Sequence, residues 1–265
     1  MSSTLFVKEM RSNAFVMAII VTVLALYIAM IVSMFDPELG ESLNMMMASM
    51  PDLFAAFGMV SPSSTLADFM LNYLYGFLLT VLPLVLVLVM VNKLVVRYLE
   101  RGTMAYLLST PISRVGIACT LVGVLVVMLV LLVVVVTALE LSVAQFMFPG
   151  ELDVVALLRA NVGLLGLWLA VTGLCFLSAC FFSNASVALW TGGGVCIVAF
   201  LIQMISQVGD KFEFLKYATP LTLFDAYGLA ANSAEAWGGT AALFAGAVLL
   251  LAAGVVVFNR RDLNI

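Results

Sequence analysis

The chain has 265 residues, of which 65% are hydrophobic and only 10% are charged, and its mean hydropathy is +1.22. An ordinary globular domain is about half apolar and about one quarter charged, so this composition excludes a soluble fold. A membrane-spanning helix uses about 20 apolar residues, and six such helices leave no room for a large soluble domain. We therefore predict an all-α integral membrane protein that forms one transmembrane domain over residues 1–265.

The residue types that most site chemistry needs are missing. The chain has no His, and its four Cys lie inside apolar runs, which predicts packing residues and not a zinc site or disulfides. A phosphate-binding loop needs Gly-Lys followed by Ser or Thr, but none of the four Lys follows a Gly. We therefore expect no enzymatic activity, and no cofactor or metal bound by this chain.

Hydropathy divides the chain into six candidate spans, at residues 14–35, 70–91, 115–139, 160–182, 187–208 and 239–258. If the N-terminus is cytoplasmic, an even number of spans returns the C-terminus to the cytoplasm. Eight of the 11 Lys and Arg residues then lie on the inner side, and 12 of the 15 Asp and Glu residues lie on the outer side. The positive-inside rule supports this orientation, so both termini are predicted to be cytoplasmic.

Charged residues are absent from the centres of these spans. Glu140 and Arg159 come closest, at the outer ends of the third and fourth spans. A rise of about 1.5 Å per residue from Arg114 places Glu140 near the outer headgroups. Two interpretations are open: the two residues pair at the interface, or they gate a substrate. Without a buried acid, the sequence shows no means of coupling transport to a proton or sodium gradient.

Helix irregularities are concentrated in the second and fifth spans. Pro83 should kink or loosen the second span, and the fifth contains Gly192, Gly193 and Gly194 in a row. Because small residues let helix backbones approach closely, these positions serve either packing or a hinge and interface for alternating access. The polar residues of the same spans either line a path for an amphipathic substrate or form hydrogen bonds between helices: Asn72, Tyr73, Tyr75, Thr80, Gln203 and Ser206.

The two long outer segments should have structure of their own. Residues 36–69 are predicted to hold an amphipathic helix at the outer interface, and residues 209–238 suggest a short re-entrant or interfacial helix. By contrast, residues 183–186 leave room only for a tight hairpin. Thioethers suit Cu(I), but no His or Cys lies nearby to complete a metal site. A flexible apolar surface for a hydrophobic substrate or for lipid is therefore the preferred interpretation of the Met-rich stretch: Met45, Met46, Met47, Met50 and Met59.

The inner segment between the second and third spans carries the most informative motif. From Glu100 to Arg114 it reads Glu-Arg-Gly-Thr, then a short apolar stretch, then Ser-Thr-Pro and a basic residue. This order resembles the corresponding segment of ABC-2 class permeases, the membrane subunits of ATP-binding-cassette transporters. Residues 6–11 resemble the amphipathic elbow helix of that family, and residues 258–263 resemble its usual Phe-x-Arg-Arg-Asp ending. Residues 33–37 and 217–225 resemble the corresponding segments of a bacterial subgroup of these permeases.

The resemblance implies the membrane subunit of an ATP-driven exporter in a bacterial cytoplasmic membrane. Such a subunit pairs with a second copy or a homologous permease and with two separate ATPase subunits, which hold ATP and Mg. Its expected substrate is hydrophobic or amphipathic, such as a peptide antibiotic, a drug or a lipid. Membrane lipid is a further expected partner, and nucleic acid is not.

The resemblance also implies roles for particular residues. Lys8, Glu9 and Arg11 fall in the elbow helix. A cytoplasmic coupling helix that docks on the ATPase takes in Glu100, Arg101, Gly102, Thr103, Met104, Ala105, Tyr106, Leu107 and Leu108. A basic face held to anionic lipid is the alternative for this segment. Two other functions stay open for the chain: a secondary carrier or channel that works without an ATPase, and a membrane scaffold with no path of its own.

Overall fold

The computed structural model describes residues 2–36, 45–57, 59, 65–96, 113–182, 184–208 and 210–260. Within these ranges every regular element is a helix. Six of the helices are long and apolar enough to cross a membrane, which confirms the prediction of an all-helical protein with six candidate spans. This is the architecture of a multi-pass membrane protein, in which most backbone polar groups are satisfied within their own helix.

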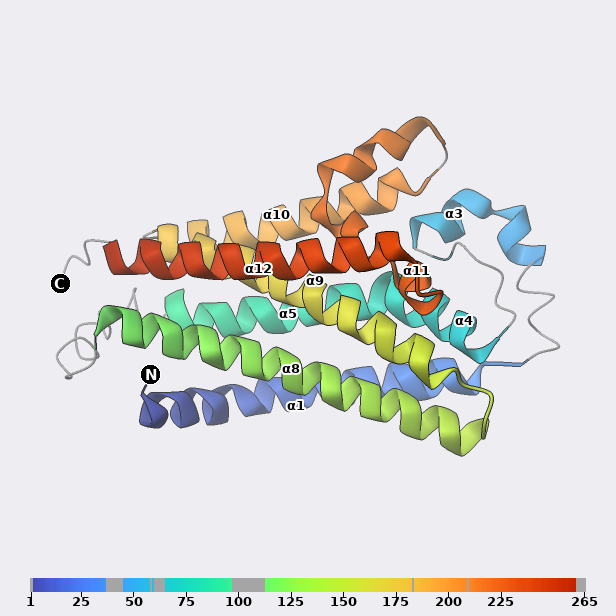
Figure 1. Ribbon diagram of the computed structural model, residues 1–265, viewed down its shortest axis with the longest axis horizontal. Coiled ribbons are helices and arrows are strands. Elements are labelled where there is room, and N and C mark those ends of the chain that lie inside the picture. The colour runs from blue at the N-terminus through green and yellow to red at the C-terminus, as the bar shows by residue number, and fades with distance from the viewer. Residues whose placement is uncertain are drawn as a thin grey trace.

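The six spans lie side by side along the long axis of the molecule (Figure 1). They are α1 (Ser3–Ser33), a composite helix of α4 (Leu66–Met70), η1 (Leu71–Leu78), α5 (Leu79–Val91) and η2 (Asn92–Val96), then α8 (Arg114–Met147), α9 (Val154–Phe181), α10 (Ala185–Ser206) and α12 (Ala234–Arg260). The start of α1 and the end of α12 lie at the same end of the bundle. Short elements gather toward the other end: α3 (Pro51–Ala56), η3 (Asp210–Ala218), η4 (Pro220–Leu223) and α11 (Ala226–Ala230).

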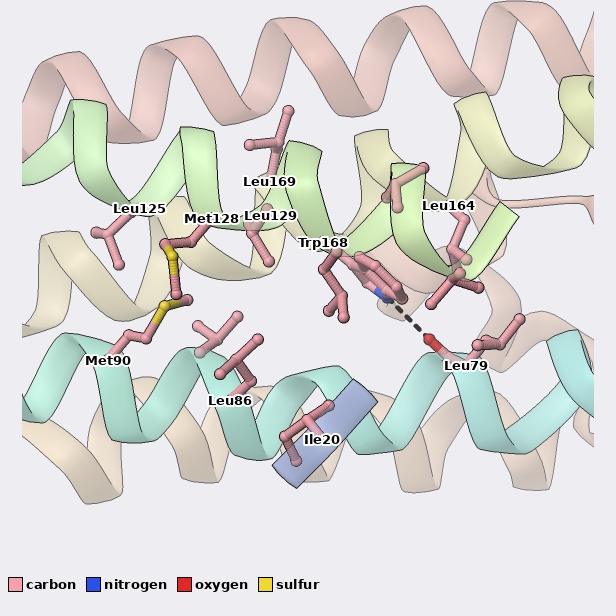
Figure 2. Close-up of a cluster of buried hydrophobic side chains, with 14 of the residues drawn as sticks. Ile20, Leu79, Leu86, Met90, Leu125, Met128, Leu129, Leu164, Trp168 and Leu169 are labelled. Atoms are coloured by element: carbon pink, nitrogen blue, oxygen red, sulfur yellow. Dashed lines mark hydrogen bonds between the residues drawn. The ribbon is translucent and has the colours of Figure 1, made fainter. Parts of the chain in front are cut away.

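Helix α9 is the central helix of the bundle, since it packs against α5, α8, α10, α11 and α12. Glycines allow α12 to lie close against it. A Cβ added at Gly173 would lie 2.9 Å from Leu250 Cβ, and one added at Gly254 would lie 2.6 Å from the Phe176 ring. On its other side α9 shares an apolar core with α5 and α8 (Figure 2), in which Leu86, Leu125, Leu129 and Leu164 are fully buried.

Polar side chains cap the helices that follow short turns. Asp153 accepts hydrogen bonds from the backbone N–H groups of Val155 and Ala156, and Asn184 accepts from those of Ser186 and Val187. Because α9 ends at Phe181 and α10 begins at Ala185, the predicted tight hairpin is confirmed.

Helix α1 runs without a break from Ser3, so Lys8, Glu9 and Arg11 lie in its first turns and not in a separate elbow. The Glu9 side chain is buried, and its Oε1 lies 3.6 Å from Lys8 Nζ. Asn13 is also buried, and its Nδ2 donates to the Glu9 carbonyl at 2.9 Å. Hydrogen bonds and an ion pair within α1 therefore satisfy its polar first turns, and the helix continues from them into the span. Within residues 2–36 no separate elbow helix precedes the span.

The first outer segment differs from the single amphipathic helix that its sequence predicts. Residues 45–57 form a short helical stretch followed by α3, and Met45, Met46 and Met50 are exposed. Phe57 anchors the segment to the bundle, with its ring centroid 5.6 Å from that of Phe77. Pro51 at the first position of α3 explains the break, because its ring is tolerated at a helix start but not in a helix interior.

The second span continues through Pro83 because another helix replaces the missing hydrogen bond. Proline has no N–H to donate to the carbonyl of residue i−4, which here is Leu79. The indole Nε1 of the buried Trp168 on α9 donates to that carbonyl at 2.8 Å (Figure 2). One turn earlier the span is a π-helix, η1, and the Thr80 hydroxyl donates to the Tyr75 carbonyl at 3.0 Å. The predicted loosening of the second span is thus found as a π-helical segment, η1, that precedes Pro83.

Replacing Trp168 by phenylalanine should lower the free energy of unfolding in detergent by about 1–3 kcal/mol, because it leaves the buried Leu79 carbonyl without a donor. Pro83→Ala restores the N–H that can bond this carbonyl. We therefore expect the Trp168→Phe penalty to shrink by about 1 kcal/mol in a Pro83→Ala background, as measured by a double-mutant cycle. Equal penalties in the two backgrounds would show that Trp168 contributes through packing alone.

Candidate functional site

A cavity of about 310 Å³ lies between η1, α5, α9, α10 and the segment formed by η3, η4 and α11. Most of its polar lining comes from the far end of the bundle, opposite the two termini. Its polar wall consists of Tyr75, Thr80, Gln203, Gln207, Lys216, Thr222, Asp225 and Tyr227. The site therefore has both a cation and an anion in its wall, together with neutral hydrogen-bonding groups.

A smaller apolar chamber of about 120 Å³ adjoins this cavity. The two share Thr80, Leu167, Phe200 and Leu221 as lining residues. Beyond these, the chamber is lined almost entirely by aliphatic side chains of α5, α9 and α10: Val81, Leu84, Val171 and Ile197, together with Cys196. A polar cavity beside an apolar one fits an amphipathic molecule, since binding sites combine apolar walls with a few placed polar groups.

The chain between α10 and α12 folds over the polar cavity by local hydrogen bonding. Pro220 occupies the start of η4, and the Thr219 hydroxyl accepts from the Leu221 N–H at 3.2 Å. Thr222 donates to the Lys216 carbonyl at 2.7 Å, which holds η3 against η4. Asp225 then caps α11 by accepting from the Gly228 N–H at 2.8 Å. In place of one interfacial helix the structure therefore has three short helices, η3, η4 and α11, because proline and capping residues interrupt the segment.

Tyr227 closes one side of this wall, and its hydroxyl donates to Asn72 on η1. Burial raises the pKa of Tyr227 well above its usual value, and the nearby carboxylates of Asp68 and Asp225 raise it further. Tyr227 therefore stays a neutral hydrogen-bond donor at any physiological pH.

The structure brings together only some of the polar residues that the sequence singled out. Tyr75, Thr80 and Gln203 line the cavity, whereas Asn72 is bound to Tyr227. The Ser206 hydroxyl donates to the Gln203 carbonyl within its own helix at 2.8 Å. Residues of the last outer segment, such as Lys216 and Asp225, were missed as site residues because they lie in irregular turns and no hydropathy pattern marks them.

Glu140 is enclosed by the helical bundle and is bonded to residues of two other spans, so the predicted pairing with Arg159 was wrong. Helix α8 continues to Met147, and the Glu140 side chain is fully buried among the helices. Its Oε2 accepts from Asn161 Nδ2 at 2.8 Å and from the Tyr75 hydroxyl at 3.1 Å. Arg159 does not pair with Glu140; instead it donates to the Ala230 carbonyl at 3.4 Å. Pairing was a natural expectation because the two residues lie at the outer ends of successive spans, but their positions along the chain do not show which side chains face each other.

The three consecutive glycines face different surroundings. A Cβ added at Gly192 would lie 3.1 Å from Cys175 Cα on α9, and one added at Gly193 would lie 2.8 Å from the end of the Leu88 side chain on α5. A Cβ at Gly194 would meet nothing within 4 Å among the described residues. Packing inside the bundle thus accounts for Gly192 and Gly193, while the hinge or interface role of Pro83 and these glycines stays a prediction.

The coupling residues Glu100 to Leu108 lie outside the described residues. Among the ranges that the structure describes, no three or more Cys, Asp or Glu side chains gather in a way that would hold a metal ion. Cys175, Cys180 and Cys196 are buried, as expected of packing residues. Cys175 and Cys196 join α9 to α10, with their sulfurs 4.0 Å apart.

Comparison of the chain with protein-family models, curated proteins and solved structures found no match in any of the three.

Proposed function

We propose that this protein is the membrane-spanning permease subunit of an ATP-driven exporter that moves a hydrophobic or amphipathic substrate. The observation that carries the proposal is a pair of neighbouring cavities between η1, α5, α9 and α10, one with several polar side chains in its wall and one lined almost entirely by apolar side chains. The order of motifs in the inner segment and at both ends of the chain supports a permease that relies on separate ATPase subunits. No step of the chemistry falls to this chain itself; it binds the substrate and changes shape.

The distribution of charge supports an orientation with both termini in the cytoplasm of a bacterial cell. Lys8, Arg11, Lys93, Arg114 and Arg260 lie at the helix ends on the side of the termini (Figure 1). Asp68, Glu151, Asp153, Asp225 and Glu235 lie at the other end. Basic residues are retained on the cytoplasmic side of spans, so the polar cavity belongs to the outer half of the bundle.

In the proposed cycle the ATPase partners, which hold ATP and Mg, act on the coupling residues between the second and third spans. The second span leads from that segment through α5 to the cavity wall at Tyr75 and Thr80. The π-helical turns of η1 and the proline at position 83 make this span the most adaptable path for such motion. A second copy of the chain, or a homologous permease, would complete the transporter.

Replacing Tyr106 and Leu107 together by alanine should release the ATPase partner or uncouple its hydrolysis from transport. Large apolar side chains at the centre of an interface contribute most of its affinity, at about 2 kcal/mol or more each. The measurement is co-purification of an ATP-binding-cassette ATPase with the protein, followed by its substrate-stimulated hydrolysis in liposomes. Phe146→Ala with Met147→Ala, at the outer end of α8, is the control and should retain both properties. An ATPase that stays bound and stimulated in the Tyr106/Leu107 variant would contradict the proposal.

One observation favours a second candidate, a carrier driven by an ion gradient. The buried Glu140 is the kind of intramembrane acid on which such coupling relies. Transport into liposomes under an imposed proton gradient, with no ATPase present, would establish the carrier. Transport that requires the ATPase and ignores the gradient would establish the exporter.

A further inference from the structure

The Glu140 cluster has more acceptors than donors. The carboxyl oxygen Oε2 accepts two hydrogen bonds, from Tyr75 and from Asn161. The other oxygen, Oε1, is buried and has no hydrogen-bond partner among the described residues, and the same holds for Asn161 Oδ1. A buried acceptor without a donor costs about 1–3 kcal/mol, so two of them on neighbouring side chains call for an explanation.

Among the residues that the structure describes, no hydrogen bond or ion pair joins a cation to Glu140. The elements that pack against α8 are α1, α5, α9 and α12. Beyond Arg11, α1 contains no charged residue, and α5 contains none. Arg159 on α9 is bonded to the Ala230 carbonyl, and Glu235 on α12 is exposed and carries the same sign as a carboxylate. Tyr75 on η1 is the only titratable group in hydrogen-bond contact with Glu140 among the described residues. An isolated carboxylate in such a place is strongly disfavoured.

We propose that Glu140 is a proton-binding site and carries its proton on Oε1 at neutral pH. The O–H group then donates to Asn161 Oδ1, while Asn161 Nδ2 donates back to Glu140 Oε2. The carboxylic acid of Glu140 and the amide of Asn161 are then joined by two hydrogen bonds in a ring. A single proton thereby supplies both missing donors and removes the buried charge. This site does not depend on the proposed function, because it follows from the contacts of Glu140 alone.

The proton site shares a residue with the cavity. Tyr75 lines the polar cavity, and its hydroxyl donates to Glu140. Loss of the proton would place a negative charge directly behind the cavity wall, where the low dielectric makes it act strongly. A cationic amphipathic ligand in the cavity would then favour proton release, and proton binding would oppose that ligand.

Infrared spectroscopy of the purified protein at neutral pH tests the proton directly. We expect a carbonyl stretch of a neutral carboxylic acid that shifts on exchange into D₂O and is lost in Glu140→Gln. Glutamine keeps the same two-way pairing with Asn161, so this variant should fold with an unchanged melting temperature. Asn161→Leu removes the acceptor, and the band should move to the frequency of a less strongly bonded acid.

If the spectrum of Glu140→Gln differs from that of the wild type only by the loss of bands from an ionised carboxylate, Glu140 carries no proton and the proposal is wrong. A second measurement separates a bound proton from a bound metal cation. If the melting temperature of the wild-type protein, and not that of Glu140→Gln, rises with Na⁺ or K⁺ concentration, a cation ligates the two oxygens and the proton site is wrong. With the proton bound, wild-type stability falls as the pH is raised above about 4.3, where the carboxyl group of the unfolded chain releases its proton while the folded state keeps it, and Glu140→Gln lacks this contribution.

Discussion

Replacing Val171 by tryptophan is expected to lower transport about tenfold or more, equivalent to about 1.4 kcal/mol of lost substrate binding. Val171 lines the apolar chamber, whose volume is only about 120 Å³. An indole ring in this place fills the space that the apolar part of an amphipathic substrate would occupy. The measurement is ATP-driven uptake of a lipophilic fluorescent dye into inside-out membrane vesicles that contain the protein and its ATPase.

Val162→Trp provides a matched control. Val162 lies on the same helix, but it is 42% exposed at the surface of the bundle and does not line the cavity. The same substitution there should leave dye transport close to the wild-type rate. If both variants transport normally, the chamber is not part of the substrate path, and the polar cavity alone would have to hold the substrate.

Replacing Gly192 by alanine should destabilise the protein by about 1–3 kcal/mol, the usual cost of overpacking. The added methyl group would lie 3.1 Å from Cys175 Cα and 3.2 Å from Ser178 Cβ. Because the first of these is backbone, the contact is relieved only if α10 moves away from α9. That movement would also strain the hydrogen bond from the Ser178 hydroxyl to the Ala188 carbonyl, now 2.8 Å. Thermal unfolding in detergent measures the loss.

Gly194→Ala should instead stabilise the protein. Its methyl group meets nothing within 4 Å among the described residues, so the higher helix propensity of alanine should add about 0.5–1 kcal/mol of stability. A loss of stability or transport in Gly194→Ala would instead place this face of α10 against a partner, such as a second copy of the chain. Equal effects of the two substitutions would contradict the packing described for Gly192.

Both predictions depend on α9, whose residues meet each part of the candidate site. Val171 faces the apolar chamber, Trp168 bonds the carbonyl left free by Pro83, and Asn161 holds Glu140. A change in the position of α9 would therefore alter the apolar chamber, the hydrogen bond next to Pro83 and the pairing of Asn161 with Glu140 at the same time. This makes α9 the reference against which movement of the second span should be measured.

Local sequence determined the number and approximate position of the spans. Runs of about 20 apolar residues and short capped turns act within one segment, so the six helices and the hairpin before α10 were predictable from composition and spacing. The polar residues Tyr75, Thr80 and Gln203 were identified for a related reason, since any polar side chain in an apolar run stands out. The resemblance of residues 100–108 to part of a permease motif likewise rests on the sequence alone.

Only the tertiary structure decided which of these polar residues meet and what each contacts. Glu140 was expected to pair with Arg159 or to gate a substrate, because distance along one helix cannot reveal that Tyr75 and Asn161, on two other spans, bind it. The partner of the Leu79 carbonyl, Trp168, lies 89 positions away in the chain. The cavity walls come from helices and irregular turns that no periodicity connects. Burial in a helical bundle depends on contacts between segments, whereas hydropathy describes each segment alone.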